Sequence, residues 1–158
     1  MLRACVVLLF CLATVSLASA CPTVPTFSTR IERASLPARP ASPVNGGGLE
    51  TYRIDWEAAR VIKIEGFNKR RNSFAGRLES LRSQIIAAVA AGECTKAEAS
   101  KAQSDIDEGL RFVREDMQFE YDELLVLYST EVGWYKVMIA EWKSCRAVGK
   151  CEEGYRYA

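Results

Sequence analysis

The chain has 158 residues, with 21 Lys and Arg against 20 Asp and Glu and no histidine. This length fits one domain with extensions, and the near-zero net charge gives no electrostatic basis for binding nucleic acid or an anionic membrane. Without histidine the chain lacks the commonest general base, metal ligand and activator of a Ser or Cys nucleophile. Because phosphate-binding and nucleophile-elbow motifs are also missing, we predict a protein that is not an enzyme and uses no cofactor or metal.

Residues 1–20 have the pattern of a secretory signal peptide. Arg3 supplies the positive end, residues 6–15 are almost wholly apolar, and Ala18, Ser19 and Ala20 are the small residues expected before a cleavage site. The apolar run is too short to span a bilayer. We therefore expect an exported protein, either periplasmic or secreted.

The residues around the predicted cleavage site have a second interpretation. The sequence Ala18-Ser19-Ala20-Cys21 resembles a bacterial lipobox, although the lipobox prefers leucine where Ala18 stands. The resemblance implies a lipoprotein anchored to a membrane through a lipidated Cys21. The same residues also form an ordinary signal-peptidase site, which would give an unlipidated protein that begins with Cys21.

Residues 21–48 are predicted to form a disordered tether. All five prolines of the chain lie between residues 22 and 43, large apolar residues are few, and Gly46-Gly47-Gly48 follows. Such a segment buries too little apolar surface to fold alone. The expected organisation is a signal peptide (1–20), this tether (21–48), a helical domain (49–148) and a C-terminal tail (149–158).

The first part of the domain is expected to be a long helical arm. Residues 52–64 are predicted as helix, because no second strong strand is present to pair with them. Arg71 interrupts the apolar pattern and Asn72 or Ser73 is placed to cap a new helix, so we expect a kink or short loop at residues 68–73. Otherwise apolar residues recur at the two seam positions of a heptad pattern: Ile64, Phe67, Phe74, Leu78, Leu81, Ile85 and Ala88.

A hinge follows at residues 91–98. Gly92 is placed to end the first arm, and Thr95 with Glu98 forms a capping box that begins the next helix. Stop and start signals this close force the two helices to be antiparallel neighbours. The turn resembles the Gly-x-Leu/Ile-Thr-x-x-Glu-Ala turn common in small bacterial envelope proteins, with Cys94 at the aliphatic position. That resemblance carries no function.

The second arm continues the pattern, so the fold class is predicted as all-α, a long antiparallel helical hairpin or small helical bundle. Folding the chain about residue 93 places Leu81 near Ile106, Phe74 near Val113, and Phe67 near Phe119. The seam residues of this arm are Ala99, Ile106, Leu110, Val113, Met117, Leu124 and Leu127.

Residues 132–142 are apolar on several sides, and further apolar residues lie beside the seam between Phe112 and Tyr128, so a second layer must cover them. That layer is the helix at 52–64, a partner protein or another copy of the chain. We also expect Gly133 to bend the helix so that residues 134–145 fold back. Burial inside the bundle explains these aromatic residues as well as binding does, but as a candidate partner surface we name Phe119, Tyr121, Tyr128, Trp134, Tyr135 and Trp142.

Four cysteines follow the signal peptide, in an oxidising compartment if the chain is exported. Cys145 and Cys151 flank a short turn at Gly149, and we predict a local disulfide between them. Cys94 is then left with Cys21 or with a second molecule. If Cys21 is lipidated, Cys94 becomes a thiol for an intermolecular crosslink.

The remaining polar residues indicate a surface rather than a catalytic site. We interpret the acidic residues Glu115, Asp116, Glu120, Asp122, Glu123 and Glu131 as the solvated face of a helix. The expected function is a non-enzymatic exported protein that binds or scaffolds other proteins in the cell envelope, as a lipoprotein if Cys21 is lipidated. Its partner is another protein or a second copy. The alternative is a secreted inhibitor or immunity-type protein that binds an extracellular enzyme.

Overall fold

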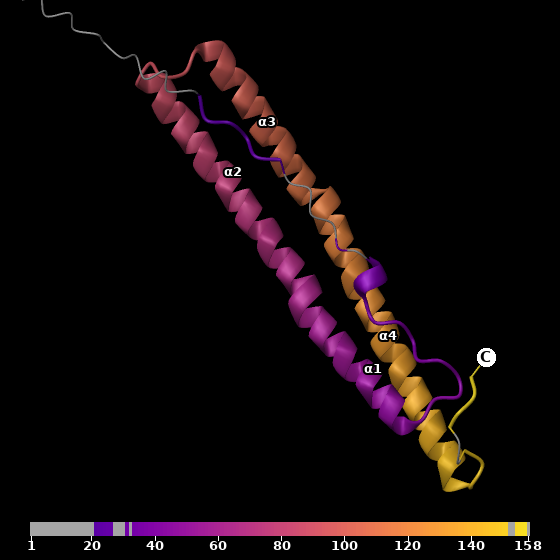
Figure 1. Ribbon diagram of the computed structural model, residues 1–158. Helices are drawn as coiled ribbons and strands as arrows, with labels where there is room; N and C mark the ends of the chain where they lie inside the picture. Colours follow the sequence, from indigo (N-terminus) through magenta and orange to yellow (C-terminus); the bar gives the residue numbers. More distant parts are fainter. Residues whose placement is uncertain (1–20, 27–30, 32, 152–153, 158) are drawn as a thin grey trace, which may run out of the picture.

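The computed structural model describes residues 21–26, 31, 33–151 and 154–157, so the predicted signal peptide lies outside the described residues. The fold is all-α and is a helical hairpin, as predicted (Figure 1). One arm consists of α1 (Gly46–Ala59), the π-helical segment η2 (Arg60–Glu65) and α2 (Gly66–Ala90), and the other of α3 (Lys96–Arg114) and α4 (Asp116–Ala147). At 1.5 Å per residue the first arm is about 70 Å long. No helix in the described ranges combines the length and apolarity that a membrane crossing needs.

The hinge forms as its sequence predicts. Gly92 has a φ of 75°, the left-handed conformation that ends a helix at little cost for glycine. The Thr95 hydroxyl accepts a hydrogen bond from the Glu98 N–H at 3.2 Å, and the Glu98 carboxylate accepts from the Thr95 N–H at 2.9 Å. This reciprocal cap starts α3 and directs it back along α2.

The predicted seam is the core between α2 and α3. Phe67, Leu78, Ile85 and Ile106 are fully buried. Leu78 lies so close to α3 that a Cβ on Gly109 would come within 2.9 Å of its Cδ1 atom, so only glycine fits there without a shift.

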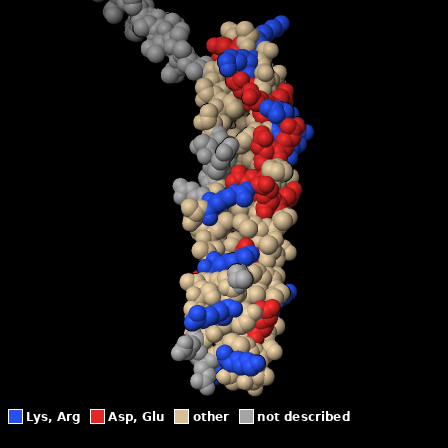
Figure 2. All heavy atoms as spheres, turned by 90° about the vertical axis from the view of Figure 1, so that its right-hand side faces the viewer, with Lys and Arg blue, Asp and Glu red and all other residues tan. Residues whose placement is uncertain are grey.

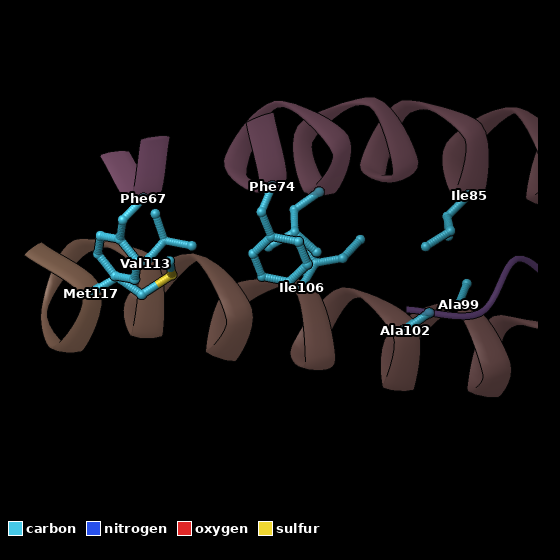
Figure 3. Packing of buried hydrophobic residues seen from close by; sticks show 9 residues of the cluster. Phe67, Phe74, Ile85, Ala99, Ala102, Ile106, Val113 and Met117 are labelled. Atoms are coloured by element: carbon cyan, nitrogen blue, oxygen red, sulfur yellow. The ribbon is translucent and has the colours of Figure 1, made fainter. Parts of the chain in front are cut away.

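The packing of the seam shifts two of the predicted pairs. Phe74 lies beside Ile106, and Val113, its predicted neighbour, lies beside Phe67 (Figure 3). Phe67 lies against Val113 and Met117, whereas Phe119 is 65% exposed and does not pair with Phe67 (Figure 3). Phe119 is instead on the outer side of its helix.

Neither predicted interruption of a helix occurs. Helix α2 runs unbroken through residues 68–73, because Arg71 finds partners across the hairpin: it donates to the Gln118 side-chain oxygen and its guanidinium lies 5.5 Å from the centre of the Tyr121 ring. Helix α4 likewise runs straight through Gly133, so residues 134–145 do not fold back. Only Glu115 separates α3 from α4.

The irregularity of the first arm lies at η2 instead. Buried positions of α1 follow the usual spacing of three or four residues, the last being Ala59, but the next buried residue is Ile64. A π-helical turn takes up one more residue than an α-helical turn. The extra residue therefore rotates α1 so that its apolar face and that of α2 both meet the second arm.

Residues 21–26, 31 and 33–45, which we call the strap, lie along the hairpin from its tip to its base (Figure 1). The only helix in the strap is the short η1 (Arg33–Ser35), as its proline content leads one to expect, but its ends are fixed. Cys21 is bonded to Cys94 at the tip, and Val44 forms an antiparallel bridge with Tyr155 at the base. The predicted tether is thus held against the helices.

Helix α1 begins at Gly46, three residues before the predicted start of the helical domain at residue 49. The glycine triplet Gly46–Gly48 is the first turn of α1 rather than the end of a tether. Asn45 caps this helix, with its side-chain oxygen accepting from the Gly48 N–H at 2.9 Å.

Candidate functional site

The hairpin has two halves of different character: a tip half made of α2 with α3, and a base half made of α1 and η2 with α4. In the base half, α1 is the second layer that the aromatic residues of α4 require. Tyr128 donates its hydroxyl to Glu57 at 2.6 Å and Tyr135 donates to Glu50 at 2.9 Å. The aromatic surplus of α4 is therefore largely used within the chain.

These two tyrosine contacts are one arrangement repeated after seven residues of each helix. Glu57 accepts from Tyr128 and pairs with Arg60 at 3.3 Å, just as Glu50 accepts from Tyr135 and pairs with Arg53 at 2.6 Å. The hydrogen bond from Tyr128 lowers the pKa of Glu57, with Arg60 acting in the same direction, while burial raises the pKa of Tyr128. These directions favour the carboxylate form of Glu57 and the phenol form of Tyr128, the two forms that pair between α1 and α4.

Three other members of the candidate partner surface also contact the chain itself. Trp134 lies edge-on to Tyr52, with ring centres 5.3 Å apart. Trp142 lies against the backbone at Gly46, where a Cβ would come within 2.6 Å of its ring. Tyr121 lies beside Arg71. Of the six residues named from the sequence, Phe119 alone is classed as exposed.

A polar cluster inside the base half fastens the strap. Arg39 donates to both carboxylate oxygens of Glu131, at 2.8 and 3.0 Å, and Tyr52 donates its hydroxyl to the same group. Arg39 and Tyr52 hold the pKa of Glu131 below its ordinary value, whereas burial and Glu131 raise the pKa of Tyr52. The Arg39 guanidinium also lies 5.0 Å from the centre of the Trp134 ring. The charges of Arg39 and Glu131 neutralise each other, and the cluster serves to hold the strap against the helices.

Two further carboxylates bind the strap, which corrects the prediction that this acidic face is simply solvated. Glu120 accepts from the Ile31 N–H at 3.2 Å, and Glu123 pairs with Arg33. Together with Glu131 they form a row that receives the basic strap along α4.

The four cysteines of the described ranges form two disulfides. Cys145 is bonded to Cys151, as predicted, with Cα atoms 5.5 Å apart. Cys21 is bonded to Cys94, with Cα atoms 5.0 Å apart, which is one of the alternatives that the sequence leaves open. The sulfur of Cys21 is therefore occupied and cannot carry a lipid in this structure. For the same reason Cys94 is not the free thiol that an intermolecular crosslink requires.

What remains exposed and apolar is concentrated in the base half. Among the residues that the structure describes, the exposed large hydrophobic side chains other than Ile86 and Val148 lie on α1, η2 and α4. Figure 2 shows the contrast on one side of the molecule: charged side chains crowd over α3, whereas the surface over α4 is mainly uncharged.

These residues form two stripes, one on each arm. The η2 stripe consists of Ile54, Ala58, Val61 and Ile62. The α4 stripe consists of Phe119, Val126, Gly133, Val137 and Ala140.

The hollows of this surface are shallow and none has the donors of a metal centre. A groove of about 410 Å³ runs beside the α4 stripe, where it is lined by Phe119, Val126, Leu127 and Arg33 of the strap. Within the described ranges no three His, Cys, Asp or Glu side chains are grouped to hold a metal ion. The candidate functional site is therefore the pair of apolar stripes.

The sequence contained a signal for the η2 stripe that the heptad analysis missed. Extending the seam of α2 backwards from Ile64 leads to Arg60, Glu57 and Arg53, which are charged, while the apolar residues are displaced by one position. That one-residue displacement indicates the π-helical insertion. Comparisons with known protein families, curated proteins and solved structures found no match to this chain.

Proposed function

We propose that this chain is an exported, non-enzymatic helical protein that binds another protein through the η2 stripe. The observation that carries this proposal is the exposure of three branched aliphatic side chains within nine residues: Ile54 at 52%, Val61 at 51% and Ile62 at 69%. Contiguous apolar surface of this kind is stabilised when a partner removes it from water.

The π-helical segment supports the proposal because it both displays and fixes the stripe. Val61 and Ile62 are adjacent residues of η2 and both face outward. Their neighbours are tied down: Arg60 pairs with Glu57 and Glu65, and Lys63 donates to the Ser35 carbonyl oxygen. Because the η2 stripe is already rigid, it loses less conformational entropy on binding. π-Helical turns also recur at functional sites.

Two disulfides are consistent with export to an oxidising compartment. Because Cys21 is engaged in one of them, we propose the unlipidated form, a component of the cell envelope that reaches its partner by diffusion. A rigid hairpin about 70 Å long suits a scaffolding role, since its base binds while its charged tip stays in solvent.

Photocrosslinking tests the proposal. A photoreactive amino acid at Val61, in the oxidised protein mixed with an envelope extract, should give a discrete crosslinked product. Ile62→Lys should reduce that product at least about tenfold, because a charge would be buried without a partner at the interface. The matched control is Ile86→Lys, which changes an isoleucine of similar exposure, 58%, in the tip half. Equal loss in both variants, or in neither, would contradict the proposal.

A further inference from the structure

We propose that the α4 stripe is the contact between two copies of this chain, whose α4 helices pair antiparallel. The proposal concerns a different face from the η2 stripe and does not depend on the proposed partner. Phe119 and Val126 are 65% and 66% exposed, and Val137 is 51% exposed. Among the outward positions between Val126 and Ala140, Lys136 alone carries a charge; the others are Val126, Ser129, Thr130, Gly133, Val137 and Ala140.

The stripe is complementary to itself only in the antiparallel sense. A two-fold axis between Ser129 and Thr130 places Phe119 opposite Ala140 of the second copy and Val126 opposite Gly133. Each large side chain thus faces a small one, and the same contacts recur on the other side of the axis, as a closed two-fold dimer requires. A parallel pair would instead place Phe119 at the height of Phe119 and Gly133 at the height of Gly133.

In the described part of the chain no contact explains a glycine at position 133. It lies within α4 with an ordinary helical φ, and a Cβ there would meet nothing within 4 Å. Glycine in a helix interior costs about 1 kcal/mol relative to alanine. A neighbouring helix that approaches closely at this position gives the glycine a purpose.

Charges beside the stripe agree with the same register. Asp122 and Lys136 are both exposed, and in the part of the chain that the structure describes neither has an ion-pair partner. The proposed axis places Asp122 of each copy beside Lys136 of the other, which gives two intermolecular ion pairs. The groove beside Phe119 and Val126 then lies at the height of the second copy's Val137.

The contact is small enough that the dimer should be reversible. From Phe119 to Ala140 the helix is about 30 Å long, and a single helix-to-helix contact of this length is at the lower end of specific interfaces. We therefore expect a dissociation constant on the order of 10 µM.

Sedimentation equilibrium of the oxidised protein tests the proposal. The protein concentration should range from about 1 to about 1,000 µM, which covers the expected dissociation constant. The expected result is a monomer–dimer equilibrium that Gly133→Glu weakens at least about tenfold, because each new carboxylate would be buried against Val126 of the other copy without a charge partner. Gly76→Glu is the matched control, since Gly76 is also exposed in a helix with open space around it. A protein that stays monomeric throughout, or a dimer that Gly133→Glu leaves intact, would overturn the proposal.

Charge exchange tests the antiparallel register separately. Asp122→Lys and Lys136→Glu should each weaken the dimer about fivefold, through two like-charge contacts, and the double variant should restore it. Failure of this rescue would overturn the antiparallel arrangement. A monomer that binds phosphatidylcholine vesicles through the α4 stripe would assign the face to lipid and overturn the proposal as well. Partner capture that depends on Ile62 leaves this result unaffected, so the two proposals fail independently.

Discussion

The two halves of the hairpin have the same helical geometry but distribute their apolar residues differently. In the tip half one seam faces inward, and the outward positions are mainly polar or charged, with ion pairs along the helix such as Lys101 with Asp105 at 2.8 Å. In the base half apolar residues face inward against the opposite helix and also outward into solvent. In the tip half, packing against one opposite helix therefore buries most of the large apolar side chains. In the base half the same packing leaves part of the apolar surface exposed.

This difference separates residues that stabilise the fold from residues that we propose to bind. In the tip half an apolar residue that lies off the seam is an exception, and Ile86 is the exposed example. In the base half most Tyr and Trp side chains have hydroxyl or ring contacts within the chain, while Phe119 and several branched aliphatic side chains remain on the outside. The following predictions test that division.

The largest contrast is expected between two phenylalanines. Phe67→Ala should lower the free energy of unfolding by about 3–5 kcal/mol, because the side chain is fully buried and leaves a cavity. Phe119→Ala should change it by less than about 0.5 kcal/mol in the monomer, because that ring is mostly in water. Urea denaturation at low protein concentration measures both. Similar losses in the two variants would contradict the assignment of Phe119 to the outer surface.

The two disulfides should differ as well, since they close loops of different length. Replacing Cys21 and Cys94 by serine opens a loop with a sequence separation of 73 residues, which should cost about 4 kcal/mol on the chain-entropy account. Replacing Cys145 and Cys151 opens a separation of 6 residues and should cost about 2 kcal/mol. Thermal unfolding, followed by circular dichroism, measures the stability of both variants. The control is the reduced wild-type protein, which lacks both disulfides. A larger loss of stability on removing the Cys145–Cys151 disulfide than on removing the Cys21–Cys94 disulfide would refute this order.

A smaller, pH-dependent effect is expected where the strap meets the base half. Glu131→Gln should cost about 1–2 kcal/mol at pH 7, because the hydrogen bonds to Arg39 and Tyr52 lose their charge. The pKa of Glu131 is lowered from 4.5 by Arg39 and then Tyr52. The ionised carboxylate thus contributes stability above pH 4.5 that is lost as the pH falls through the folded-state pKa. The difference between variant and wild type should therefore shrink below about pH 4.

The control for this titration is Glu108→Gln on the exposed face of α3, which should change stability by less than about 0.5 kcal/mol. The loss of unfolding free energy in Glu131→Gln could instead stay constant between about pH 3 and about pH 7, on both sides of the carboxylate transition. That result would show that the carboxylate charge is not what holds the strap.

The smallest effect on stability is expected from shortening η2. Deleting Ile62 leaves a spacing of four residues between the buried positions now held by Ala59 and Ile64, which suits an uninterrupted α-helix. Unfolding free energy should change by about 1 kcal/mol or less, with the helical circular dichroism signal retained. Crosslinking at the η2 stripe should be lost. A deletion variant that unfolds would show that the inserted residue is needed for the fold rather than for binding.

The sequence predicts the elements that depend on local chemistry and on one repeating pattern. The capping box at Thr95 and Glu98, the left-handed Gly92, the seam residues and the short disulfide at Cys145 all follow from spacing within a few turns. Each of these is fixed by neighbours in the chain or by the heptad alone.

Features that depend on distant partners were not predictable in this way. Arg71 breaks the seam by sequence, yet Gln118 and Tyr121 on the other arm accommodate it without a break in α2. The strap is rich in proline and has few large apolar residues, which is the composition of a disordered segment. It is held by isolated contacts far apart in sequence, such as Arg39 with Glu131, and a composition does not reveal such contacts.

The bond between Cys21 and Cys94 fixes residue 21 at one end of the long hairpin, and this position determines how the protein can be attached to a surface. Residue 21 is fixed at the hinge end, about 70 Å from the end where Val44 pairs with Tyr155. Immobilising the protein on a sensor surface by its hinge end, beside Cys94, thus leaves both stripes pointing into the flow. Coupling through the carboxyl terminus brings the stripes toward the matrix and masks them.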